Sequence, residues 1–204
     1  MNELHKALDD ISSIRKQVAR TTEFRGYGPT TLAATGAFAM LAAVIQSVWV
    51  PNPGTDISRY LTVWVATALL SAVVTGVQMY TRSRRLHSAL SDEMIRLAVE
   101  QFLPAAGTGL LLTVVFLLYV PTLAWMLPGL WQVIFSLGIF SSCRFLPRPV
   151  LAAAIWYLFT GLFCISLGDV RALSPWAMGI SFGAGQFLVA GILLRGSRKA
   201  SDEI

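Results

Sequence analysis

The sequence has little charge, little histidine and little cysteine. Charged residues make up 13% of the 204 residues, against roughly 25% in an average soluble protein. The two histidines, His5 and His87, both lie outside the long apolar segments. A bis-histidine haem between membrane helices is therefore excluded, and two isolated histidines do not make a metal site. Cys143 and Cys164 lie at different depths of neighbouring segments and are expected to be free thiols. We expect no cofactor and no metal.

Recognisable catalytic motifs are also missing. The chain contains no HExxH zinc motif, no Walker phosphate loop, no dinucleotide-binding glycine pattern and no paired intramembrane aspartates. The apolar segments hold no Asp, Glu or Lys, and their only arginine is Arg144 at one edge. Proton-coupled transport generally needs an ionisable relay in mid-membrane, and catalysis needs an acid–base pair. We therefore expect neither an enzyme nor a proton-coupled transporter.

Long apolar segments are what the sequence has instead, since 55% of its residues are hydrophobic. A helix of about 20 residues crosses a hydrocarbon core about 30 Å thick. Six segments approach that length: 30–50, 60–80, 105–127, 129–146, 150–167 and 175–194. They are apolar on every face, and lipid offers the backbone no hydrogen-bond partner, so they must be helices. The predicted fold is all-α, an integral membrane bundle of six transmembrane helices.

Lysine and arginine gather on one side of this predicted bundle. Of the 16 such residues, all but Arg59 and Arg171 fall in the two terminal tails or in the connections after the second and fourth spans. The positive-inside rule then makes both termini cytoplasmic and predicts a multi-pass protein of the cell (inner) membrane. Basic residues beside spans usually meet anionic lipid head groups, so lipid is the expected partner of this charge and nucleic acid is not.

Two cytoplasmic stretches resemble each other. "LHKALDD" at Leu4–Asp10 and "LHSALSD" at Leu86–Asp92 agree at five of seven positions. Each opens an apolar stripe with helical spacing, which predicts two amphipathic cytoplasmic helices. Pro29 and Pro104 follow these helices and are each predicted to begin a span. The unit is then an amphipathic helix plus a transmembrane hairpin, used twice as a tandem repeat, although coincidence between two amphipathic helices is the alternative.

The pattern predicts six parts. They are a cytoplasmic helix and hinge (1–29), a first hairpin (30–80), a second cytoplasmic helix (81–104), a second hairpin (105–146), a third hairpin (147–194) and a cytoplasmic tail (195–204). The two helices either lie in the head-group plane or pack on each other and on a protein partner. The residues predicted to form this partner surface and hinge are Ile14, Arg15, Arg20, Glu23, Arg25, Leu86, Leu90 and Met94.

The hinge carries a resemblance. "ARTTEFRGYGPTT" at Ala19–Thr31, together with an Ile-Arg pair ahead of it, resembles the junction between tail and first span in uncharacterised bacterial multi-pass membrane proteins. The resemblance covers about the first 45 residues and implies a membrane protein, but it implies no activity. Gly26 and Gly28 would permit the bend from an interfacial helix to an upright span.

Uncharged polar residues remain within the spans. The candidates are Ser71, Thr113, Ser136, Tyr157, Thr160 and Gln186. Gly179 and Gly183 form a small-xxx-small pair that permits close helix packing. Either the polar groups form hydrogen bonds between helices, or they line a cavity for a small neutral ligand, which a bend at Pro121 would open.

Two functions follow from these observations. The first is a non-enzymatic sensor, regulator or complex subunit that works through its cytoplasmic helices, with a cytoplasmic or membrane protein partner and with homo-oligomerisation left open. The alternative is a facilitator or small transporter of a neutral solute. A dry seam packed with glycine favours the first function, and a continuous polar cavity reaching Gln186 favours the second.

Overall fold

A computed structural model describes residues 28–86, 89–142 and 148–202, and it describes the side chains of residues 28–81, 100, 102–142 and 149–195. Within this part of the chain every regular element is helical. The long helices are α2 (Pro29–Trp49), α3 (Ile57–Leu86), α4 (Ala89–Tyr119), α5 (Leu127–Ser142), α6 (Leu151–Ser166) and α7 (Pro175–Asp202). Three short 3-10 helices connect them: η1 (Pro121–Met126), η2 (Arg148–Val150) and η3 (Val170–Leu173).

In the described part of the chain, five helical stretches are long and apolar enough to cross a membrane. They are α2, residues 57–81 of α3, residues 102–119 of α4, η1 with α5 (121–142), and residues 175–195 of α7. The apolar helix α6 is shorter, at 16 residues. The predicted all-helical bundle with several spans of membrane length is therefore confirmed.

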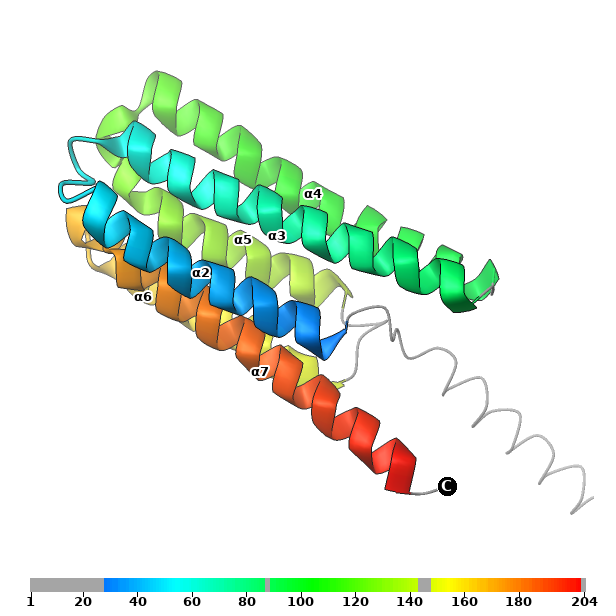
Figure 1. Ribbon diagram of the computed structural model, residues 1–204. Helices are drawn as coiled ribbons and strands as arrows, with labels where there is room; N and C mark the ends of the chain where they lie inside the picture. The colour runs from blue at the N-terminus through cyan, green and yellow to red at the C-terminus, as the bar shows by residue number, and fades with distance from the viewer. Residues whose placement is uncertain (1–27, 87–88, 143–147, 203–204) are drawn as a thin grey trace, which may run out of the picture.

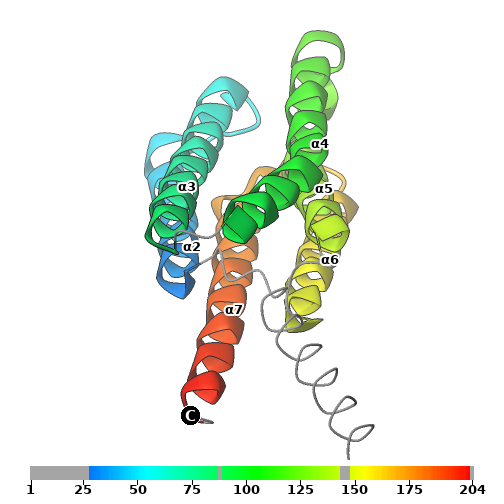
Figure 2. The same cartoon turned by 90° about the vertical axis from the view of Figure 1, so that its right-hand side faces the viewer.

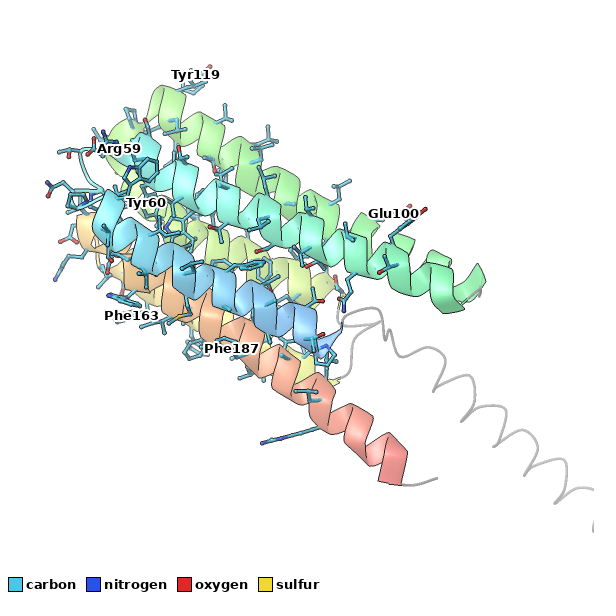
Figure 3. The ribbon with its side chains drawn as sticks, viewed as in Figure 1. Arg59, Tyr60, Glu100, Tyr119, Phe163 and Phe187 are labelled. Atoms are coloured by element: carbon cyan, nitrogen blue, oxygen red, sulfur yellow. The ribbon has the colours of Figure 1, made fainter. Side chains whose placement is uncertain are left out.

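Large apolar side chains cover the outside of the bundle, as a lipid-facing surface requires. Val48 is 80% exposed, Tyr119 77% and Phe163 68%. Figure 3 shows Tyr119 at the end of α4 and Phe163 on α6, both on the outside of the bundle.

The helices pack in an order that leaves α3 and α4 apart. The closest pairs are α2 with α7 and α5 with α6, and further contacts join α4 to α5, α2 to α3 and α6 to α7. Contacts between α3 and α4 are few, although these helices follow each other in the chain. In Figure 1 they meet at one end and separate toward the other, and Figure 2 shows α2 and α3 on one side of α7 and α4, α5 and α6 on the other.

The bundle has two distinct ends (Figure 1). We call one the loop end, because it holds residues 50–56, η1 and η3, which connect successive helices. The other, which we call the basic end, holds the start of α2, the adjoining ends of α3 and α4 and the end of α7. Among the described residues, the loop end carries Arg59 and Arg171, whereas the arginines at positions 82, 84, 85, 96 and 195 belong to helical segments at the basic end.

Two predicted helix boundaries at proline meet different outcomes. Pro29 begins α2 as predicted, directly after the N-cap residue Gly28. The predicted start at Pro104 is wrong, because α4 runs from Ala89 through Pro104 to Tyr119. From Ala89 onward the second predicted cytoplasmic helix is therefore continuous with the third predicted span, whereas its first residues, up to Leu86, belong to α3. Proline is tolerated inside a membrane helix where the freed backbone groups are satisfied locally.

The expected bend at Pro121 is also wrong. Pro121 does not lie within the third span but begins η1, after α4 has ended at Tyr119. Val120, with φ −139° and ψ 53°, has left the helical region, as expected of a residue that precedes proline. The third and fourth predicted spans, 105–127 and 129–146, correspond to helical stretches 102–119 and 121–142.

Aromatic side chains fill the core between α4, α5, α6 and α7. The ring of Phe135 on α5 makes edge-on contacts with Phe102, Tyr157 and Phe182, at centroid distances of 5.3, 4.9 and 5.4 Å. Edge-to-face packing at these distances is favourable beyond the apolar area that it buries. This aromatic contact holds α4 to the bundle through α5.

Candidate functional site

Glycines form a seam between α2 and α7, which we call the α2/α7 seam. A Cβ added at Gly179 would lie 2.5 Å from the Cβ of Ala43, and one added at Gly183 would lie 2.8 Å from the Sδ of Met40. From the facing helix, a Cβ at Gly36 would lie 3.1 Å from the carbonyl oxygen of Gly183. At Gly179 a side chain would overlap Ala43, and at Gly36 and Gly183 the neighbouring atoms would have to move to make room, so glycine at these positions allows α2 and α7 to pack closely.

A second seam joins α5 to α6, and we call it the α5/α6 seam. A Cβ at Gly129 would lie 2.7 Å from the carbonyl oxygen of Gly161, and a Cβ at Gly161 would lie 2.8 Å from that of Gly129. The two backbones are thus in direct contact. Ser136 crosses the same interface, donating from Oγ to the carbonyl oxygen of Ala154 at 2.8 Å. The sequence analysis missed Gly129 and Gly161, because neither belongs to a small-xxx-small pair on its own helix.

The predicted intramembrane polar residues do not meet at one place. They are distributed over α3 (Ser71), α4 (Thr113), α5 (Ser136), α6 (Tyr157 and Thr160) and α7 (Gln186). Gln186 is half-buried and belongs to the α2/α7 seam, because a Cβ added at Gly36 would lie 3.1 Å from the Cβ of Gln186. Ser71 is half-buried on α3.

Most of these polar groups bond to backbone carbonyls or to a neighbouring helix. Thr113 Oγ1 donates to the carbonyl oxygen of Gly109 at 2.7 Å and accepts from Trp131 Nε1 at 2.9 Å. Thr160 Oγ1 donates within its own helix to the carbonyl oxygen of Trp156 at 2.9 Å. These contacts are the interhelical and intrahelical bonds expected of uncharged polar groups in a membrane core.

Two aromatic donors link α6 to α7 in the same way. Tyr157 donates from its hydroxyl to the carbonyl oxygen of Phe182 at 3.4 Å, and Trp156 Nε1 donates to that of Ser181 at 2.9 Å. Ser181 in turn donates from Oγ to the carbonyl oxygen of Ala177 at 2.6 Å. The hydrogen-bonding capacity of this interface is therefore used in holding the two helices together.

A buried polar cluster that the sequence analysis missed lies at the loop end. We call it the loop-end cluster and define it by Gln46, Tyr60, Trp64, Gln132 and Cys164. Gln46 is fully buried on α2 and joins two other elements. Its Nε2 donates to the carbonyl oxygen of Leu173 at 2.7 Å, and its Oε1 accepts from Trp64 Nε1 at 2.7 Å.

The other members of the cluster are less well paired. Gln132 Nε2 donates to the carbonyl oxygen of Ala177 at 3.3 Å and lies 3.8 Å from the Sδ of Met178. Gln132 Oε1 and the hydroxyl oxygen of Tyr60 are buried and have no hydrogen-bond partner among the described residues. Leaving a buried polar group unpaired costs about 1–3 kcal/mol.

The sequence did contain a signal for this cluster. Gln46 and Gln132 are amides inside otherwise apolar runs, "AAVIQSVW" and "GLWQVIF", and a polar group inside a membrane helix is seldom without a role. Of the span amides, only Gln186 was predicted from the sequence as a candidate, as the amide expected to lie deepest in the membrane. In the structure Gln186 is only half-buried, whereas the side chains of Gln46 and Gln132 are fully buried.

The exposed turn between α6 and α7 carries the closest ion pair of the described loop end. Gly168, at φ 71°, adopts the left-handed conformation that ends α6. The next residue, Asp169, accepts from the backbone N–H of Arg171 at 2.9 Å and from its Nε at 2.9 Å. These hydrogen bonds lower the pKa of the Asp169 carboxyl below its usual value. Both side chains therefore stabilise the conformation of the turn.

The predicted cytoplasmic candidates are only partly covered by the structure. Ile14, Arg15, Arg20, Glu23 and Arg25 lie outside the described residues. Leu86 is the last residue of α3, and Leu90 and Met94 lie in the first turns of α4, but their side chains are outside the described part. The start of α2 is tied to α3, because the Gly28 N–H donates to Gln78 Oε1 at 3.3 Å.

Comparison with known proteins gives no identity. No protein-family model, no curated protein and no solved structure matches the chain. Among the described residues, no three His, Cys, Asp or Glu side chains come together as they would to hold a metal ion. The features that remain for a functional argument are the two glycine seams, the loop-end cluster and the helices that extend at the basic end.

Proposed function

We propose that the chain is a six-span protein of the cell (inner) membrane with both termini on the cytoplasmic side. The short helix α6 counts as the sixth span, because α5 ends at the basic end and α7 begins at the loop end, so α6 runs between them (Figure 1). Its 16 residues measure about 24 Å at 1.5 Å each. A span this short is accommodated by local thinning of the bilayer or by flanking residues that reach the interface.

The distribution of arginine supports the orientation. The basic end carries most of the arginines in the described residues, and cytoplasmic segments of membrane proteins carry an excess of lysine and arginine. A phosphatase fused after Ile204 and expressed in bacteria should therefore be inactive, since it needs the periplasm. Strong periplasmic activity of that fusion would overturn the orientation.

We further propose that the protein is a non-enzymatic sensor, regulator or complex subunit that works through its cytoplasmic helical segments. The observation that carries this proposal is the glycine packing of the α2/α7 and α5/α6 seams. In these two interfaces close helix packing occupies the space that a solute pathway between the helices would need. The parts left for interaction are the segments at the basic end, where α3, α4 and α7 extend beyond α2 and α5 (Figure 1).

The test compares two surfaces of one helix. A photo-cross-linking residue is placed in the first turns of α4, and cross-linked products are collected from native membranes of cells that carry either of two variants. Leu90→Lys puts a charge on the predicted apolar stripe, and Ser91→Lys puts the same charge one position away on a different face. We expect Leu90→Lys to abolish a specific cross-linked product that Ser91→Lys leaves intact.

Truncation tests the other predicted helix. Removing residues 1–20 should also abolish the specific product and any phenotype of the intact gene. If the truncated chain keeps every cross-linked product and every phenotype, the cytoplasmic helix is not the working surface.

The loop-end cluster favours a second candidate function, the facilitated passage of a small neutral solute. Its unpaired Tyr60 hydroxyl and Gln132 Oε1 are the polar groups that an uncharged solute would need. Proteoliposomes holding the purified protein should then equilibrate glycerol faster than empty liposomes, and Gln132→Leu should remove the difference. Equal rates in protein-containing and empty vesicles would eliminate this candidate.

A further inference from the structure

The loop-end cluster contains one hydrogen-bond donor and one acceptor that the protein itself leaves unused. The Tyr60 hydroxyl and Gln132 Oε1 are the buried side-chain atoms without a partner in the described residues, and both residues are 0% exposed. The nearby amide of Gln46 uses its nitrogen and its oxygen, and Trp64 uses its N–H. Buried polar groups in native proteins are generally paired, so two exceptions in one region require an explanation.

The contacts of Gln132 Nε2 determine the orientation of the Gln132 amide. Gln132 Nε2 faces the carbonyl oxygen of Ala177 and the Sδ of Met178. A flipped amide would place Oε1 against that carbonyl oxygen, which cannot donate. Oε1 is therefore the atom of this amide that is left as an acceptor with no donor.

Several contacts bring Tyr60 and Gln132 into the same region. Tyr60 belongs to one core cluster with Met178, the residue whose sulfur lies beside Gln132 Nε2. The same core cluster includes Leu127 at the start of α5, and Trp131, the residue before Gln132, packs against it. Gly161, which lies one turn before Cys164, would place a Cβ 3.0 Å from the Cβ of Gln132.

The surroundings restrict the chemistry of a ligand. The Cys164 thiol already faces the carbonyl oxygen of Ala172 at 3.5 Å. The described charges of the loop end belong to Asp56, Arg59, Asp169 and Arg171, whose carboxylate and guanidinium groups are exposed and form local pairs. A charged ligand would find no opposite charge in this apolar interior and would be strongly disfavoured.

We propose that Tyr60 and Gln132 form a binding site for a small uncharged molecule with a hydroxyl or amide group. The ligand's oxygen accepts from the Tyr60 hydroxyl, and its O–H or N–H donates to Gln132 Oε1. Tyr60 lies near the start of α3 (Figure 3). This proposal rests on the second candidate function, which it deepens by stating how the two groups bind the molecule, and it does not depend on the cytoplasmic helices. Binding of a probe without glycerol flux would retain the binding site and eliminate solute passage.

The test is ligand-observed NMR on the full-length protein in lipid nanodiscs, with acetamide as the amide probe and ethanediol as the hydroxyl probe. The wild type should transfer saturation to at least one probe. Tyr60→Phe and Gln132→Met each remove one of the two groups at nearly constant volume and should reduce the transferred signal at least fivefold.

Matched variants separate this site from general effects. Tyr157→Phe removes a buried hydroxyl that already has a partner in the carbonyl oxygen of Phe182, and Gln186→Met changes an amide outside the cluster. Both should keep the wild-type signal. Absence of signal in the wild type, or equal loss in all four variants, would overturn the proposal.

Thermal unfolding of the same samples gives an independent result. If the Tyr60 hydroxyl is simply an unpaired group in a dry core, Tyr60→Phe will raise the unfolding temperature and acetamide will stabilise neither protein, which also overturns the proposal. If one substitution prevents folding, the other one decides, because each removes only one side of the site.

Discussion

The two glycine seams and the α3–α4 pair differ sharply in packing. Along the α2/α7 and α5/α6 seams, backbone meets backbone, and 39% of the spanning window of α2 is buried. On α4 the buried share of the spanning window is 6%, although α4 is among the longest helices. Length and hydropathy bring a helix into the membrane, but small residues facing each other decide which helices hold together.

Glycines in the two regions should respond to alanine in opposite ways, and this is the largest effect we expect. Gly161→Ala places a Cβ 2.8 Å from the carbonyl oxygen of Gly129, and because backbone cannot move aside, the free energy of unfolding should fall by about 3 kcal/mol. Gly76→Ala and Gly107→Ala place a Cβ where nothing lies within 4 Å. They should be neutral or stabilising by up to about 1 kcal/mol, because alanine favours the helix.

Unfolding in mixed micelles measures these three variants. If Gly161→Ala were as stable as Gly76→Ala, close backbone contact would not be what holds α5 to α6.

The second-largest change in stability is expected when the buried amide of Gln46 is replaced. Gln46→Leu leaves the Trp64 N–H and the carbonyl oxygen of Leu173 buried without partners, so unfolding should become easier by about 2 kcal/mol. Gln186→Leu changes a half-buried amide outside the cluster and should alter stability by less than about 0.5 kcal/mol. Tryptophan fluorescence of Gln46→Leu should also shift, because Trp64 loses its acceptor.

A smaller effect is expected where α4 is attached to α5. Thr113→Val keeps the shape of the side chain but removes the acceptor of Trp131 Nε1. The cost should be about 1 kcal/mol, within the range of hydrogen bonds between membrane helices. Cross-linking between cysteines placed at the loop ends of α4 and α5 should become slower in the variant, and an unchanged rate would show that the aromatic contacts alone fix α4.

The smallest effect concerns the exposed turn. Hydrogen bonds from Arg171 lower the pKa of Asp169 in the folded state. The stability that this pair contributes is therefore fully present above the usual carboxyl pKa of about 4 and is lost as the pH falls through the lowered value. The unfolding temperature of the wild type and of Asp169→Asn should differ slightly at pH 7 and converge once the pH falls below the lowered pKa of Asp169. A difference that stays the same in acid would contradict the assignment.

Hydropathy predicted the helical segments well and their ends poorly. In "LLLTVVFLLYVPTLAWMLPGLW" apolar residues continue across the turn at Val120, so composition alone places the end of α4 too late. At Pro104 the start of the helix was placed too late, because proline favours a helix start. The polar residues before Pro104 belong to the same helix. Hydropathy indicates which segments favour lipid over water, whereas the position of a helix end depends on the backbone conformation of one or two residues.

The candidate site was harder to predict, because it is made by residues distant in the sequence. Gln46 pairs with the carbonyl oxygen of Leu173, 127 positions away, and with Trp64 on another helix. Gly129 and Gly161 face each other from different helices. Spacing along one helix identifies pairs such as Gly179 and Gly183, but it contains no information on which helix they face.

The pairing of α2 with α7 has a consequence for biogenesis. These are the first and last long helices described, so during synthesis Gly36 on α2 enters the bilayer well before Gly179 and Gly183 exist. Until α7 leaves the ribosome, the face of α2 that carries Gly36 meets lipid or an insertion factor. A nascent chain stopped before α7 is therefore an open intermediate, and the synthesis of α7 closes the bundle around α2.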